Sequence, residues 1–301
     1  YKRLHTRVET VRKELLAILG LAVAHWADVL PSLTELQVLR AGGDDEASVF
    51  TNMYHIQTHR RVRALHRLGD AAEAGSLRSR TLSELFVPLV WLFLLPNQSG
   101  GIDMNMANEA LACIRRMATH LQWGHYYYWL KRFLRQLKEH AGKDETSASE
   151  RLHVRGIVGV LEAFHFPMDE DVEMSDDPIA DESSTQAPPH AIAHDLTHDA
   201  ADARSLPRAQ RLALATTLTT RVLPPLYEAL ATKDEDRLPA RLPLLIGTAR
   251  LAMYLPSDRR NVELFKVFSE LGSALRSKLQ STRDTCRDMG VQMPVSYTHL
   301  T

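Results

Sequence analysis

The chain has 301 residues, of which 45% are apolar, and 36 Lys and Arg against 37 Asp and Glu give a net charge of −1. This length and composition allow a sizeable core, either as two ordinary domains or as one elongated array. The overall charge does not indicate a nucleic-acid binder, so only local charge is informative. Only two cysteines, Cys113 and Cys286, are present and they lie far apart in sequence, so no disulfide framework is implied and a reducing intracellular compartment fits best.

Targeting and membrane segments are not evident in the sequence. The most apolar stretch, residues 85–95, is too short to cross a bilayer and contains Pro88. The chain opens without Met, directly on a helix-like pattern, so we expect a fragment of a longer protein.

Helical periodicity recurs along the chain, and strand patterns are almost absent. We expect helices near residues 3–24, 27–41, 47–74, 78–94, 104–121, 124–140, 149–166, 205–231, 238–255 and 260–288. Turn-forming dipeptides separate many of them. These are Gly42-Gly43, Pro96-Asn97, Gly100-Gly101, Pro224-Pro225 and Pro256-Ser257.

Two adjacent segments indicate how these helices are arranged. Residues 242–256 form an apolar helical pattern, and after a short Pro-containing turn residues 264–289 form a second one that ends in an Arg-Asp pair. This arrangement resembles a HEAT repeat, a unit that buries its apolar face only against a neighbouring unit. The sequence therefore favours a stack of helical pairs over the alternative, a compact helical bundle.

We predict an all-α fold, an α-solenoid of irregular HEAT-like helical repeats with a disordered acidic insertion. The repeats occupy residues 1–168 and 205–293, and the insertion occupies residues 169–204. The last residues, 294–301, resemble a translated adaptor scar, so we exclude them from fold reasoning.

The insertion at 169–204 differs in composition from the rest of the chain. It contains eleven Asp and Glu, one Arg and few aliphatic residues, so it cannot bury enough apolar area to offset the entropy lost on ordering. Three histidines, His190, His194 and His198, follow a helical spacing within it. We interpret the tract as unstructured and not as a metal site, because a metal site needs ligands held by a scaffold.

Motifs for catalysis are absent from the sequence. There is no Gly-rich phosphate loop after a strand, no CxxC pair, no HExxH helix and no GxSxG elbow. We therefore predict that the chain is not an enzyme and that it uses no cofactor, metal ion or small-molecule substrate. An all-α enzyme with a site built from distant residues is the rival interpretation.

The stretch 50–68, FTNMYHIQTHRRVRALHRL, combines three histidines and four arginines with apolar positions. On one continuous helix, an apolar set of residues forms the core face. This set is Phe50, Met53, Tyr54, Ala64, Leu65 and Leu68. His55, His59 and His66 fall on the far side of the same helix, away from the core.

Two polar side chains in that stretch, Gln57 and Arg61, fall on the core side four residues apart. Burying them is costly unless they find partners, so we interpret them as a polar staple between neighbouring repeats. His55 and His59 have a spacing that suits a metal ion, but no Cys or Asp nearby completes a ligand set.

Two groups of cations are candidate contacts for RNA or a partner protein. Arg60, Arg63 and Arg67 form a basic ridge, and planar guanidinium groups suit phosphate. In the aromatic-basic stretch 125–138, three further candidates follow Tyr126–Trp129. They are Lys131, Arg132 and Arg135. Aromatic and basic residues in this order are able to stack bases and hold a backbone, although an ordinary buried stripe with solvated charges fits the same pattern.

Several motifs in order resemble one family. They are LHTRVETVRKELLAIL (4–19), FTNMYHIQTHRRVRALHRL (50–68), LQWGHYYYWLKRFLRQL (121–137), VLEAFHF (160–166), RVLPPLYEAL (221–230), RLPLLIGTARLAMYLP (241–256) and STRDTCRDM (281–289). Together they resemble the Down-regulated-in-metastasis (DRIM) family, also called the family of U-three small nucleolar RNA-associated protein twenty. The resemblance covers nearly the whole chain except the insertion and the scar. The loop at 96–106 is longer than we expect between paired helices, which puts the local repeat boundaries in question.

The resemblance implies a large nucleolar HEAT-repeat scaffold. Its members are structural components of the small-subunit processome, where they support assembly of the 40S subunit and processing of pre-rRNA to 18S rRNA. The implied partners are pre-rRNA and processome proteins, without a membrane, and the implied location is the nucleus and nucleolus. The family motifs specify no catalytic residue. The alternative is a karyopherin-like HEAT-repeat adaptor that binds only proteins.

Overall fold

The computed structural model describes residues 2–6, 8–44, 47–96, 100–140, 147–166, 168, 208–231 and 237–292. The expectations for the acidic insertion at 169–204 and for the scar at 294–301 concern segments outside these described residues.

Every regular element in the described ranges is a helix, which confirms the all-α class. The α-helices are α1 (Glu9–Trp26), α2 (Pro31–Thr34), α3 (Val49–Asn52), α4 (Thr58–Glu73), α5 (Ser79–Thr81), α6 (Val87–Trp91), α7 (Met104–Ala118), α8 (Trp123–His140), α9 (Ser147–Glu162), α10 (Arg208–Thr217), α11 (Leu223–Leu230), α12 (Leu238–Arg241), α13 (Pro243–Met253), α14 (Ser257–Leu275) and α15 (Gln280–Gln292). The other turns are the 3₁₀ elements η1 (Lys2–His5), η2 (Glu35–Gly43) and η4 (Leu92–Leu94), and the π-helical elements η3 (Leu82–Phe86) and η7 (Leu218–Val222).

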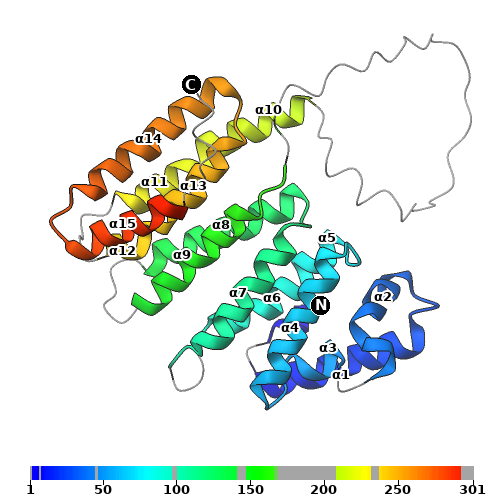
Figure 1. Ribbon diagram of the computed structural model, residues 1–301. Coiled ribbons are helices and arrows are strands. Elements are labelled where there is room, and N and C mark those ends of the chain that lie inside the picture. Colours follow the sequence, from blue (N-terminus) through cyan, green and yellow to red (C-terminus); the bar gives the residue numbers. More distant parts are fainter. Residues whose placement is uncertain are drawn as a thin grey trace, which may run out of the picture.

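The long helices pack in two sets that run along the molecule (Figure 1). In the first set, α7 packs against α4 on one side and α9 on the other, and α9 packs in turn against α13. Helices of the second set cover the first: α6 lies against α7, α8 against α9, and α11 and α14 against α13. Because α9 precedes residues 169–207 and α13 follows them, helices on both sides of that segment share one core.

The core contains a chain of aromatic side chains that links successive helices. Trp91 of α6 packs against Trp129 and Phe133 of α8, with ring centroids 5.7 Å and 4.5 Å apart. Tyr126 of α8 is fully buried and donates its hydroxyl to the carbonyl of Val160 on α9, at 2.6 Å. A buried tyrosine needs such a partner, because an unbonded hydroxyl would lose its hydration without compensation. The apolar stripe expected in residues 125–138 is therefore part of the core.

The helix expected over residues 47–74 is broken, which corrects the sequence-based prediction. The chain forms α3, turns through residues 53–57 and then begins α4, with Gln57 in an extended conformation before the first turn. Buried Met53 and Tyr54 occupy the turn, and the Tyr54 hydroxyl donates to the Leu89 carbonyl at 2.8 Å. Packing decides this break: α3 lies against α1 while α4 lies against α7, and one straight helix does not reach both.

Other helix boundaries differ from the expectation in similar ways. The segment expected as one helix over 260–288 is two, α14 and α15, which meet at residues 276–279. The segment expected over 27–41 is a short α2 followed by the 3₁₀ element η2. Such boundaries are weakly encoded in single-sequence periodicity, because several apolar registers satisfy the same pattern.

Prolines inside two helical segments are accommodated by π turns. Pro88 follows η3, and Pro224 and Pro225 follow η7. A proline lacks the N–H that would bond to the carbonyl four residues earlier, and a widened turn removes the demand for that bond. Helical structure therefore continues through Pro224-Pro225, within the segment expected as one helix over residues 205–231. The dipeptide does not separate two helices, as its composition had suggested.

In the described part of the chain, no single helix is long and apolar enough to cross a bilayer. Helix α1 and residues Pro31–Arg40 together reach that length and apolar content, but they are bent by 116° relative to each other.

Candidate functional site

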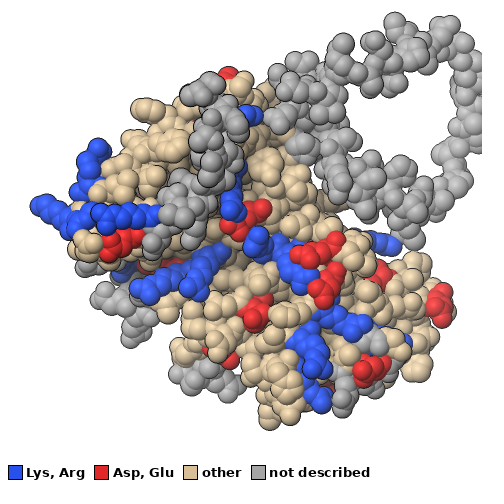
Figure 2. All heavy atoms as spheres, viewed as in Figure 1, with Lys and Arg blue, Asp and Glu red and all other residues tan. Residues whose placement is uncertain are grey.

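The basic ridge expected from the sequence lies on α4. The Arg63 side chain is exposed, whereas Arg60 and Arg67 are half-buried. The guanidinium of Arg67 lies 3.4 Å from the carbonyl oxygen of Val38 on η2. Figure 2 shows Lys and Arg side chains gathered over α4 on the viewed face. Of the three ridge residues, Arg63 is therefore the most open to a partner.

Further positive groups surround the turn that precedes α4. The pKa of His55 lies below its ordinary value because of desolvation by the surrounding chain and, next, because of the charges of Arg60 and Lys13. Arg61 bonds to the carbonyl oxygen of His55 and to the Glu9 carboxylate, the latter at 3.1 Å. Positive side chains from α1 and α4 thus lie near His55, and the Glu9 carboxylate is paired with Arg61.

The structure places the two residues of the expected polar staple differently. Arg61 is half-buried and reaches from α4 to Glu9 on α1. Gln57 is exposed, so the expectation that it faces packed surface is wrong. The reason is the broken helix. The helical periodicity that placed Gln57 beside Arg61 assumed a continuous helix through residues 53–57, where the chain turns instead.

The histidines of this stretch do not converge. His59 is exposed, and the Nε2 atom of His66 lies 2.8 Å from the Glu109 carboxylate on α7. In the ranges that the structure describes, no group of three or more His, Cys, Asp or Glu side chains is placed to hold a metal ion.

The three candidate cations of α8 occupy different environments. The Arg132 guanidinium lies over the rings of Trp91 and Trp129, at 4.9 Å and 5.0 Å, so it is part of the aromatic packing. Lys131 is exposed and its ammonium lies 5.2 Å from the Tyr127 ring centroid. Arg135 is exposed and lies 3.8 Å from the Glu139 carboxylate. Lys131 and Arg135 are therefore exposed at the surface, whereas Arg132 packs on rings of the core.

The two groups of cations lie on different helix pairs. α4 packs on α7, whereas α8 packs on α9, so the α4 ridge and the α8 cations belong to separate parts of the surface. The structure does not merge them into one site.

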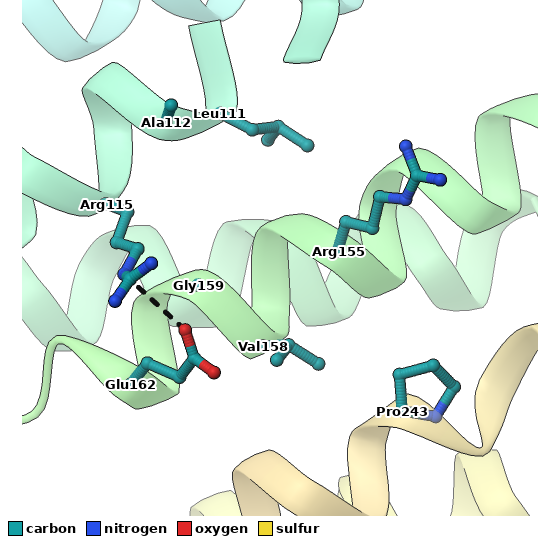
Figure 3. Close-up of a pocket in the computed structure, with 8 residues that line it drawn as sticks. All are labelled: Leu111, Ala112, Arg115, Arg155, Val158, Gly159, Glu162 and Pro243. Carbon is teal, nitrogen blue, oxygen red and sulfur yellow. Dashed lines mark ion pairs between the residues drawn. The ribbon is translucent and has the colours of Figure 1, made fainter. Parts of the chain in front are cut away.

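A feature that the sequence reasoning missed is a groove where α7, α9 and α13 meet (Figure 3). Its volume is about 220 Å³. The residues that line it are Leu111, Ala112, Arg115, Arg155, Val158, Gly159, Glu162 and Pro243. We call this the α7–α9–α13 groove. No local sequence motif predicts it, because its lining residues come from three separate helices and line one groove only when those helices pack side by side.

Ion pairs cross the same layer of helices. The Glu162 carboxylate on α9 lies 3.5 Å from Arg115 on α7 and 2.5 Å from Arg250 on α13. Between α4 and α7, Arg116 bonds to Asp70 and, at 2.7 Å, to Glu73. The Arg116 guanidinium holds the pKa of Glu73 below its usual range, mainly through that hydrogen bond. Polar contacts between neighbouring helices are therefore made largely by residues other than those expected.

Comparison with known proteins gives two kinds of match. Residues 231–296 match the family model described as the U3 small nucleolar RNA-associated protein 20 domain. The chain is 28% identical over 280 residues to U3 small nucleolar RNA-associated protein 20 of Schizosaccharomyces pombe, covering 93% of this chain and 10% of that protein. It is 24% identical over 287 residues to the protein of the same name from Saccharomyces cerevisiae, covering 94% of this chain and 10% of that protein.

These matches confirm the family resemblance that the sequence motifs indicate. The family model covers only residues 231–296, whereas the two relatives match nearly the whole chain. This chain spans about a tenth of the length of each curated relative.

Proposed function

We propose that this chain, given its similarity to U3 small nucleolar RNA-associated protein 20, is a segment of a non-enzymatic scaffold of the small-subunit processome. In this role it supports 40S assembly and processing of pre-rRNA to 18S rRNA in the nucleolus, by contacting pre-rRNA and assembly factors. The observation that carries the proposal is the similarity along 93% of the chain to a curated relative named for its association with U3 small nucleolar RNA.

The architecture supports a scaffold. We infer that the two sets of helices are irregular HEAT-like repeats of an α-solenoid, with α4, α7, α9 and α13 forming one layer. Such a stack offers a long exterior on which several partners bind at once. The polar contacts that cross the layer, such as Arg116 with Glu73, lie at the surface and align neighbouring helices more than they stabilise them.

Exposed apolar side chains at both ends support continuation of the stack. Ile18 and Leu21 on α1 are 60% and 61% exposed, and Val262 and Phe265 on α14 are 55% and 75% exposed. These helices lie at opposite ends of the array (Figure 1). A helical repeat without a neighbour exposes apolar surface of this kind, because its face is made to be buried by the next repeat.

Contact with RNA is supported by the exposed cations. Arg63 on α4 and Lys131 and Arg135 on α8 are exposed. Exposed guanidinium and ammonium groups are suited to binding phosphate. These side chains would bind the phosphate charge of the RNA and not its bases. The contact would therefore position the scaffold on the RNA without recognising a nucleotide sequence.

In-cell crosslinking of the tagged protein, followed by sequencing of the attached RNA, tests the proposal. We expect crosslinks to the 18S region of pre-rRNA or its flanking spacers. The variant Arg63→Gln with Lys131→Gln should reduce them, and the matched control Arg80→Gln, which removes an exposed charge paired with Glu84, should not. Recovery of nuclear-pore repeats or a small GTPase without pre-rRNA would replace this proposal by the karyopherin-like adaptor.

A further inference from the structure

The floor of the α7–α9–α13 groove is apolar. Leu111, Val158 and Pro243 contribute side chains to it from three different helices. Gly159 lines the groove without a side chain, and a Cβ built there would make only ordinary contact with the stem of Arg115, at 3.6 Å or more. The groove therefore exposes hydrocarbon between packed helices, where an apolar group of a partner would lose water on binding.

The rim of the groove is positive. Glu162 is already engaged by two guanidinium groups, those of Arg115 and Arg250. Arg155 donates to the neutral side-chain oxygen of Asn108, at 2.9 Å, so that contact does not balance its charge. Among the lining residues, Glu162 is the one carboxylate and is paired with Arg115, whereas Arg155 lies apart from it along α9 (Figure 3). The side of the rim that carries Arg155 is therefore open to an anion.

The size and chemistry of the groove limit its occupant. About 220 Å³ is less than the roughly 300–1,000 Å³ of pockets for small organic ligands, so a single side chain fits better than a cofactor. None of its lining residues is aromatic, so a nucleotide base would find no ring to stack on. An aliphatic side chain beside carboxylates satisfies both the floor and the rim.

We propose that the α7–α9–α13 groove docks an acidic peptide segment of a partner protein. An aliphatic side chain of that segment occupies the floor, and a neighbouring Asp or Glu accepts hydrogen bonds from Arg155. Guanidinium and carboxylate are matched in geometry, and such charge-assisted bonds are stronger than neutral ones. The inference goes beyond the proposed function, because it concerns a different surface and holds whether or not the α4 and α8 cations contact RNA.

Fluorescence anisotropy with the 301-residue chain tests this proposal. The probe is a short labelled peptide in which one leucine is flanked on both sides by pairs of aspartates. We expect saturable binding that weakens about tenfold when serine replaces the leucine, because less apolar surface is then buried. It should weaken by a similar factor when asparagines replace the aspartates, because the charge-assisted bonds no longer form.

Two variants locate the binding. Gly159→Leu fills the floor with a residue of better helix propensity, so it should abolish binding while thermal melting stays unchanged or rises. Arg155→Gln should weaken binding about tenfold. The matched control is Arg151→Gln, which removes an exposed arginine of the same helix that does not line the groove, and it should leave binding within about twofold.

Four outcomes would overturn the proposal. The first three are no binding of the leucine peptide, equal binding of the serine peptide, and unchanged binding of the leucine peptide to the Gly159→Leu variant. The fourth is that single-stranded oligouridine displaces the peptide and that the Arg155→Gln variant binds oligouridine more weakly than the natural chain does. The last outcome would make the groove a phosphate site. Failure to recover pre-rRNA in cells would leave these peptide results unaffected, so the two proposals fail separately.

Discussion

Arg241 on α12 donates a hydrogen bond to the carboxylate of Glu150 on α9, and the two side chains are only 7% and 4% exposed. The residues lie on opposite sides of the acidic tract in sequence. Arg241 also donates to the carbonyl of Ala229 at 2.9 Å, so its remaining donors are partly satisfied. A buried pair of this kind holds two helices in register, because neither charge is tolerated there without the other.

Replacing Glu150 by alanine should therefore destabilise the protein strongly. We expect a loss of about 3–5 kcal/mol in the free energy of unfolding, since Arg241 would remain buried without its partner. Denaturant titration followed by circular dichroism measures it. The double variant Glu150→Met with Arg241→Met should lose less than Glu150→Ala, because apolar side chains of similar size replace both charges. A loss below about 1 kcal/mol for the single variant would mean that the pair is hydrated.

Two glycines of α9 should respond oppositely to alanine. A Cβ at Gly156 would overlap the Phe133 ring, so Gly156→Ala should cost about 1–3 kcal/mol of stability through overpacking. Gly159→Ala is the control, because a Cβ there makes ordinary contacts. It should leave stability unchanged or raise it by up to about 1 kcal/mol, the difference in helix propensity. Equal effects at both sites, measured by thermal melting, would contradict the close packing of α8 on α9.

Stability should fall on mild acidification, with His125 contributing. Its pKa is lowered from the ordinary 6.5, first by burial and then by Arg80, while Glu84 acts in the opposite direction. Its Nδ1 atom lies 2.8 Å from the Ser79 hydroxyl, which itself accepts the Gln122 N–H. The neutral tautomer with an unprotonated Nδ1 accepts the O–H that Ser79 still has to donate. Because the unfolded chain binds the proton more readily, stability is full above the unfolded pKa and decreases as pH falls below it.

The comparison is the melting temperature at about pH 7.5 and about pH 5.5, for the natural chain and for His125→Asn. Asparagine retains an acceptor oxygen near the Nδ1 position and does not titrate, so its pH dependence should be smaller. An identical fall in melting temperature for both chains would assign the pH dependence to other groups.

Binding of single-stranded RNA should depend on salt through the α4 ridge. Replacing Arg60, Arg63 and Arg67 by glutamine should weaken binding, and the slope of log affinity against log salt should flatten by roughly one unit for each phosphate that the ridge no longer neutralises. Arg63→Gln should carry much of the change, because Arg63 is exposed whereas Arg67 lies against the Val38 carbonyl. An unchanged slope in filter-binding titrations, with Arg80→Gln as control, would mean that the ridge faces only water.

The helical class and the core faces could be predicted because they are local properties. The period of apolar residues placed Leu65 and Leu68 on a buried face, and both are fully buried. The apolar stripe of residues 125–138, which includes Trp129 and Phe133, could be predicted in the same way, and both rings lie in the core. Each of these residues is buried by a neighbouring helix, and its place on the apolar face can be predicted from the periodicity of its own helix.

Contacts between distant helices could not be predicted in the same way. Gln57 was misplaced because a turn at residues 53–57, set by the packing of Tyr54 against Leu89, interrupts the helix that periodicity suggested. Arg132 has the sequence context of an exposed cation, but it lies over two tryptophan rings, one of which comes from another helix. Such outcomes depend on which helices become neighbours, and a single helical pattern does not specify its partner.

The sequence by itself determined that this chain is helical, which faces of its helices are apolar, and which family it resembles, because all three are recorded in residue order. Only the tertiary structure decided that Glu150 would pair with Arg241 across the acidic tract and that Arg115, Arg155 and Glu162 would surround one groove. The physical reason is that burial of apolar surface favours many helix arrangements almost equally. The final one is selected by close packing and by the pairing of buried charges between segments that are far apart in the chain.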